Sequence, residues 1–188
     1  AKSDAITAAR LGNSDAVKQG DIAVATGNLY GTGSAIGYGI ITDTQGYQYG
    51  TDCGYGLLLS DIRYEVNGYG FICNTSGEIT AVVTTEITAK NNSLLGGYQA
   101  SEVRTLIENL INGRNRSYFG IKGQAVSVAA EDNYGIPAGL YVSTVEVGSP
   151  AYSAGIQTGD IITRVDAKTI ESMSDFMDKL EMTSSGEA

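Results

Sequence analysis

The side chains that most often carry out acid-base and nucleophilic chemistry are scarce in this chain. Its 188 residues include no histidine and only two cysteines, Cys53 and Cys73. Without histidine the commonest general base is missing, and with it the base of a Ser-His-Asp or Cys-His site. Two cysteines without histidine also cannot complete a four-ligand zinc site. The sequence therefore predicts neither a metal centre nor a cofactor.

The two cysteines leave two interpretations open. Cys53 and Cys73 are expected on neighbouring strands of one sheet, so a disulfide between them is possible. The favoured alternative is that both are small apolar core residues.

The charge of the chain narrows the classes of partner. Twenty-one acidic residues against twelve basic ones give a net charge of −9 and a pI near 4.4, which argues against a surface that neutralises nucleic-acid phosphates. No run is long and apolar enough to span a bilayer, so any membrane anchor is expected outside this chain. The chain opens on Ala1 without a signal sequence, and both ends look cut, which predicts a processed protein or a fragment.

The first half of the chain has the pattern of an all-β domain. Two apolar, β-rich runs at residues 57–62 and 79–83 enclose a turn-rich segment at 65–71, and Asn67-Gly68 and Ser76-Gly77 are turn signals. Tyrosines flanked by glycine could indicate a sugar-stacking or self-associating repeat. We favour a small barrel in which glycines permit tight bends and tyrosines cover the faces.

The spacing of apolar residues then changes to that of a helix over residues 100–112. Ser101 is the expected N-cap and Gly113 the expected stop. The apolar stripe could bind a partner, but packing on the barrel is the ordinary explanation. Its members are Val103, Leu106, Ile107, Leu110 and Ile111.

The last third of the chain carries further helix signals. Ser149-Pro150 starts a short helix that Gly155 ends, and Gly159-Asp160 turns into a buried strand at 161–165. A second helix is expected over 173–182, with Ser172 or Ser174 as its cap.

Several of these segments resemble HtrA-like, trypsin-fold serine proteases with a C-terminal PDZ domain. Leu11-Gly12-Asn13-Ser14-Asp15 resembles the start of that family's second β-barrel. Ser60-Asp61-Ile62 and Gly77-Glu78-Ile79 resemble the segments that flank its nucleophile, and in that register Tyr69 stands at the nucleophile position. Tyr118-Phe119-Gly120-Ile121 resembles the PDZ carboxylate loop, and Ser149-Pro150-Ala151 to Gly159-Asp160 resembles the PDZ core.

The resemblance implies a fold that is mainly β with minor α. We expect the C-terminal, six-stranded half of a trypsin-like double β-barrel, followed by an α+β PDZ domain. The expected boundaries are residues 1–98 for a degenerate second barrel, 99–116 for a connecting helix and linker, and 117–188 for a PDZ domain that lacks its last strand. The family also implies an extracytoplasmic location in a bacterial envelope and a part in protein quality control.

The resemblance leaves three functions in competition. The favoured one is an inactive homologue that binds peptides or protein C-termini. Inactivity is expected because the bulky phenol of Tyr69 cannot replace a serine beside an oxyanion hole. The second is part of an active endopeptidase whose first barrel lies outside this chain. The third is an assembly or adhesion module, and a homo-oligomer, formed through an open barrel edge. The expected peptide-binding residues are Tyr118, Phe119, Gly120, Ile121, Phe176, Met177 and Leu180.

Overall fold

The computed structural model describes residues 8–31, 33–65, 68–84, 94–113 and 117–183. These residues form two compact units. The first contains the described residues up to 48 and those from 55 to 108, and the second contains 49–54 and the described residues from 109 onward. No helix in this described part is both long and apolar enough to cross a membrane.

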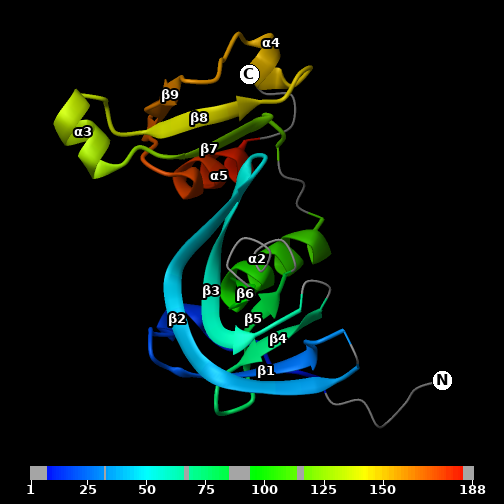
Figure 1. Ribbon diagram of the computed structural model, residues 1–188. Helices are drawn as coiled ribbons and strands as arrows, with labels where there is room; N and C mark the ends of the chain where they lie inside the picture. The colour runs from blue at the N-terminus through cyan, green and yellow to red at the C-terminus, as the bar shows by residue number, and fades with distance from the viewer. Residues whose placement is uncertain (1–7, 32, 66–67, 85–93, 114–116, 184–188) are drawn as a thin grey trace. The chain divides into compact units, whose positions relative to one another are not determined.

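Six antiparallel strands close a barrel in the order β1-β2-β3-β6-β5-β4 (Figure 1). Because β1 pairs with β4 as well as with β2, the expectation of an open barrel edge is wrong. The prediction of a mainly β fold with a six-stranded barrel is confirmed. The strands are β1 (Ile22–Asn28), β2 (Ala35–Gly50), β3 (Cys53–Arg63), β4 (Tyr69–Cys73), β5 (Ile79–Val83) and β6 (Leu94–Gln99).

The barrel is filled by side chains that alternate inward and outward along each strand. On β1, Ala23 and Ala25 are buried while Ile22 is exposed. Glycine lets neighbouring strands approach closely in this narrow interior: a Cβ added at Gly37 would lie 2.6 Å from the Ile62 side chain. Leu58, Ile72 and Leu95 are among the fully buried residues of the barrel core.

The turn between β4 and β5 agrees with the sequence signal. Gly77, with φ +78°, donates its N–H to the Asn74 carbonyl at 3.0 Å. The Asn74 side chain accepts from the N–H groups of Ser76 and Glu78, both at 3.0 Å. Asn67 of the other predicted turn lies outside the described residues.

The helix predicted after the barrel is α2 (Ala100–Ile111), which follows β6 without a break. Ser101 lies within the helix and is not its N-cap. Its N–H donates at 3.0 Å to Oγ of Ser14, a residue of the short helix η1 (Ser14–Ala16). The hydroxyl of a residue far away in sequence thus satisfies a donor at the helix start. Gly113 follows the helix with φ +63°, as expected for a stop.

The apolar stripe of α2 does not pack as predicted. Ala100 is the buried residue of this helix, whereas Leu110 and Ile111 are 69% and 78% exposed. The interpretation that the stripe packs on the barrel is therefore wrong for this end of the helix.

The second unit contains a three-stranded antiparallel sheet with β8 (Leu140–Val145) between β7 (Ile121–Ala125) and β9 (Ile161–Ile162). Strands β10 (Arg164–Val165) and β11 (Lys168–Thr169) form a separate pair. In the described part of this unit the sheet is accompanied by the helices α3 (Val128–Tyr134), α4 (Pro150–Ser153) and α5 (Met173–Met182). The core joins the sheet to α5 through buried residues that include Ile121, Leu140, Val142, Met173 and Phe176.

Local capping explains where these helices begin. Ser149 caps α4, and Ser172, not Ser174, caps α5 by accepting from the Asp175 N–H at 3.2 Å. The predicted strand at 161–165 is divided at Thr163 into β9 and β10. Helix α3 was not predicted, although the Ser127 cap and the left-handed Gly135 are its local signals.

The two cysteines do not lie on neighbouring strands, contrary to expectation. Cys53 is on β3, which pairs with β2 and β6, and Cys73 is on β4, which pairs with β1 and β5. Neither takes part in a disulfide. Burial raises the pKa of the Cys73 thiol, which disfavours the reactive thiolate.

Candidate peptide-binding site

The segment that leads into β7 turns its amide groups to one side. Its carbonyls are held by the body of the second unit: the Ala151 N–H donates to Phe119 O at 3.0 Å, and the Glu146 N–H donates to Gly120 O at 2.9 Å. Gly120 has φ +95°, and a Cβ at this position would lie 2.1 Å from the Ser149 Cβ. Glycine is therefore required here both by conformation and by space.

Three backbone amides of this segment point to one carboxylate, that of Asp52. The N–H groups of Phe119 and Gly120 both donate to Oδ2 at 2.7 Å, and the Ile121 N–H donates to Oδ1 at 2.9 Å. The Asp52 N–H in turn donates to Ile121 O at 2.7 Å. Asp52 is 6% exposed, so the three bonds to its carboxylate solvate a buried charge.

Asp52 lies in the turn between β2 and β3, within the segment 49–54 that belongs to the second unit. Its φ of +51° is unusual for a residue other than glycine, although aspartate tolerates it better than most. A left-handed residue costs roughly 1–2 kcal/mol. Since a hydrogen bond to a charged group contributes about 1.5–3 kcal/mol, the three amide bonds outweigh this cost.

A second carboxylate, Glu146, lies beside the loop. Thr51 Oγ1 donates to its Oε1 at 2.5 Å, and the Tyr118 hydroxyl donates to its Oε2 at 2.7 Å. The hydrogen bond from Thr51, then that from Tyr118 and the charge of Lys122, lower the pKa of Glu146, although partial desolvation opposes them. The same bond to Glu146, followed by desolvation and the nearby negative charges, raises the pKa of Tyr118.

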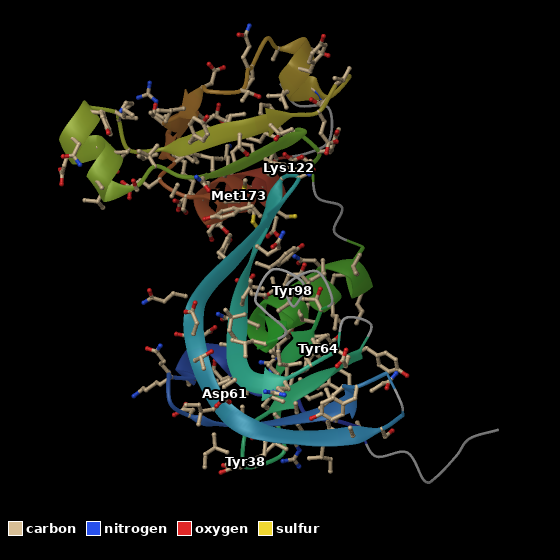
Figure 2. All side chains as sticks on the ribbon, viewed as in Figure 1. Tyr38, Asp61, Tyr64, Tyr98, Lys122 and Met173 are labelled. Atoms are coloured by element: carbon tan, nitrogen blue, oxygen red, sulfur yellow. The ribbon has the colours of Figure 1, made fainter. Side chains whose placement is uncertain are left out.

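Helix α5 packs beside β7; Met173 and Lys122 mark these two elements in Figure 2. Phe176 is buried, and its ring meets that of Phe119 edge to face with centroids 5.5 Å apart. Leu180 is buried in the same core. Met177 is half-buried, and its Sδ accepts from the Gly54 N–H at 3.2 Å.

The seven residues predicted for peptide binding therefore lie around one loop and one helix of the second unit. Among the described residues, β7 pairs with β8 alone, which leaves its other edge on the side where Asp52 binds Ile121. Sequence reasoning missed Asp52, Thr51 and Glu146. A threonine and an aspartate in a turn are ordinary, so no local signal could have found the first two.

The predicted nucleophile position shows no comparable arrangement. Tyr69 begins β4, pairs with Asn28 and is 67% exposed. Ser60 is fully buried, and its Oγ accepts from the Ile62 N–H at 3.3 Å. The Asp61 carboxylate accepts from the Ile40 N–H at 2.8 Å. Ser60 and Asp61 thus serve local structure within the barrel, and Tyr69 is a surface residue.

Comparison with known proteins agrees with this division. A model of the PDZ domain matches residues 141–187. The periplasmic pH-dependent serine endoprotease DegQ of Escherichia coli K12 is 28% identical over 188 residues, which cover 96% of this chain and 41% of DegQ. A probable periplasmic serine protease do/HhoA-like of Haemophilus influenzae is 27% identical over 96% of this chain and 41% of its own length. The chain is HtrA-like and carries a PDZ domain.

Solved structures show the same fold. The HtrA-type protease AlgW, solved with a decapeptide, superposes with a TM-score of 0.69 at 22% identity over 99% of this chain and 59% of AlgW. The serine endoprotease from Yersinia pestis gives a TM-score of 0.60 at 25% identity over 96% of this chain and 59% of its own. The HtrA-like chain spans about two fifths of the length of the curated relatives it matches.

We predict that Glu146→Gln destabilises the second unit at neutral pH and has a smaller effect in acid. The pKa of Glu146 is lowered in the folded state, so its carboxylate stabilises the fold above the ordinary pKa of a glutamate, and this stabilisation is lost as pH falls through the lowered value. Urea unfolding of wild type and variant at pH 7 and pH 3 measures the gap between their free energies of unfolding.

Tyr118→Phe provides the matched control, because it removes one of the two hydroxyls that donate to Glu146. It should show a smaller gap with the same dependence on pH. A Glu146→Gln gap that stays constant between pH 7 and pH 3 would contradict the assignment.

Proposed function

We propose that this chain binds peptides or protein C-termini along the edge of β7 opposite β8, beside α5. The observation that carries the proposal is the convergence of three backbone amides, from Phe119, Gly120 and Ile121, on a carboxylate. PDZ domains bind an extended peptide in this way, with its terminal carboxylate on backbone N–H groups and its strand on a sheet edge. The structure of the HtrA-type protease AlgW was solved with a decapeptide, which supports the same use of this fold.

We further infer that this chain does not hydrolyse peptide bonds by itself. It has no histidine, and residues 65–71 contain no serine, threonine or cysteine, so Tyr69 carries the one hydroxyl of that loop. No register within this loop therefore places a serine, threonine or cysteine at the nucleophile position. The alternative, an active endopeptidase completed by residues outside this chain, is favoured by the names of the relatives, which are serine endoproteases.

We also infer an extracytoplasmic location, because the relatives are named as periplasmic proteins. The peptide-binding domain is proposed to comprise residues 117–188, preceded by the connecting segment 99–116 and the barrel at 1–98. We propose a role of the chain in protein quality control from its likeness to HtrA-type proteases.

We expect a peptide with a free C-terminal carboxylate and an apolar last residue to bind with a micromolar dissociation constant, about −8 kcal/mol. The apolar preference follows from the surroundings of the loop, which include Phe119 and Met177. The net charge of −9 should weaken binding of acidic peptides, more so at low salt. Fluorescence polarisation with a library of labelled C-terminal peptides measures these preferences.

The control for each peptide is its amidated twin, which lacks the terminal charge. If no free-carboxylate peptide binds better than its twin, the assignment of the binding site is wrong.

We expect no stoichiometric labelling of the chain by a fluorophosphonate probe and no cleavage of casein. The reason is that no histidine is present to activate a serine. Tyr69→Ser should leave both results unchanged, since the base is still missing. Stoichiometric label on any serine, found by mass spectrometry, would refute the proposal of inactivity.

We expect the chain to dimerise through the outer face of β1, β2 and β4. Ile36, Tyr38 and Tyr69 are 77%, 72% and 67% exposed, and Ile22, Ile40 and Phe71 extend the patch (Tyr38 in Figure 2). Contiguous apolar surface of this kind favours association. Light scattering at high protein concentration should give a dimer for wild type and a monomer for Tyr38→Lys.

Tyr134→Lys is the matched control, because Tyr134 is similarly exposed, at 79%, but belongs to α3 of the second unit. It should stay dimeric. A wild-type monomer at high concentration would rule out the proposed interface.

A further inference from the structure

We propose that Asp52 is an internal ligand of the carboxylate loop, so that a peptide C-terminus can enter only when the β2–β3 turn withdraws. The part of this proposal that concerns competition rests on the proposed peptide-binding function. The occupation of the loop by Asp52 stands on geometry alone.

Asp52 uses every group that a terminal residue would need. Its carboxylate takes the N–H groups of Phe119, Gly120 and Ile121, and its own N–H reaches Ile121 O, the first acceptor on the β7 edge. These distances of 2.7–2.9 Å are those of charge-assisted hydrogen bonds, so no donor of the loop is left for a second carboxylate. A peptide and Asp52 therefore exclude each other.

The neighbours of Asp52 bind the same site at two further points. Thr51 donates to Glu146, which follows β8, and the Gly54 N–H donates to Met177 on α5. The turn thus contacts the loop, the end of β8 and α5 at once. Withdrawal must break all three contacts together, which makes the occupied state a defined alternative to the peptide-bound one.

The conformation of Asp52 also argues for a ligand. Asparagine and glycine adopt a φ near +51° more readily than aspartate does. Of the residues that tolerate this conformation, aspartate is the one that also supplies a charge. The carboxylate accepts from three backbone N–H groups, and Asp52 is 6% exposed. A turn with no binding role needs no buried carboxylate.

Occupation of the loop lowers the apparent affinity for peptides. The apparent association constant equals the intrinsic one multiplied by the fraction of molecules in which the turn is withdrawn. If that fraction is about one in ten or less, loss of the Asp52 carboxylate strengthens peptide binding about tenfold or more. The gain appears without any new contact between protein and peptide.

The test compares the full chain as wild type, Asp52→Asn and Asp52→Gly, since both replacements suit a positive φ. The probe is a fluorescein-labelled decapeptide that ends in valine with a free carboxylate, read by fluorescence polarisation. Asp52→Gly should bind about tenfold tighter or more, and Asp52→Asn should lie between it and wild type. Equal or weaker binding by Asp52→Gly overturns the proposal and leaves peptide binding itself intact.

Asp43→Asn is the matched control, because Asp43 is on β2 of the same hairpin and its carboxylate accepts from the Gln45 N–H. It should bind the probe as wild type does.

A second measurement needs no peptide. The amide resonances of Gly120 and Ile121 in ¹⁵N-¹H spectra should move in Asp52→Gly and stay in place in Asp43→Asn, because Asp52 is their acceptor. Unchanged Gly120 and Ile121 resonances in Asp52→Gly overturn the internal ligand. If no variant binds the probe, the proposed function fails, and the Gly120 shift alone supports or overturns the internal ligand.

Discussion

The structure around the loop of the second unit depends on one requirement: buried backbone N–H groups need hydrogen-bond acceptors. Gly120 and Ile121 are buried, and their N–H groups cannot turn inward, because the adjoining carbonyls are already bonded to Glu146 and Ala151 on that side. Donors left without a partner at such a depth are costly. Ser149 contributes by capping α4 and by filling the space beside Gly120. The result is a fixed cradle for a carboxylate, and the Asp52 carboxylate lies in it.

The constraint on the barrel is a different one, because six strands must close around a narrow interior. Glycine leaves room where a larger residue would collide. A Cβ at Gly37 would meet the Ile62 side chain, and one at Gly97 would meet the Val82 backbone. The tyrosines between them turn outward or pack on one another, as Tyr55 and Tyr98 do edge to face. Packing thus explains the glycines of this pattern, whereas Tyr38 and Tyr69 are exposed on the outer face of the barrel.

The likeness to HtrA-type proteases and the chemistry of this chain point to different parts of the molecule. The barrel has the fold of a protease, yet Ser60, Asp61 and Tyr69 serve local structure or solvent-exposed surface. Function belongs to sites more than to folds. The site with converging donors, a buried charge and shifted pKa values lies in the second unit, around the loop and Glu146.

Much of the local structure could be read from the sequence, because its signals act over a few residues. Ser149-Pro150, Gly155 and the Ser76-Gly77 turn each bond or bend the backbone within about four residues, and the structure has them where they were predicted. The absence of histidine likewise limited the chemistry at once. The PDZ likeness was equally visible, since its core motif is continuous in sequence.

The tertiary structure alone decided what joins distant segments. Closure of the barrel depends on the pairing of β1 with β4, and the start of α2 is satisfied by Ser14, 87 residues before Ser101. Asp52 reaches amides 67 to 69 residues further along the chain. Neither its residue type nor its neighbours signal this, because the attraction between a carboxylate and three amides acts only after folding has brought them within 3 Å of each other.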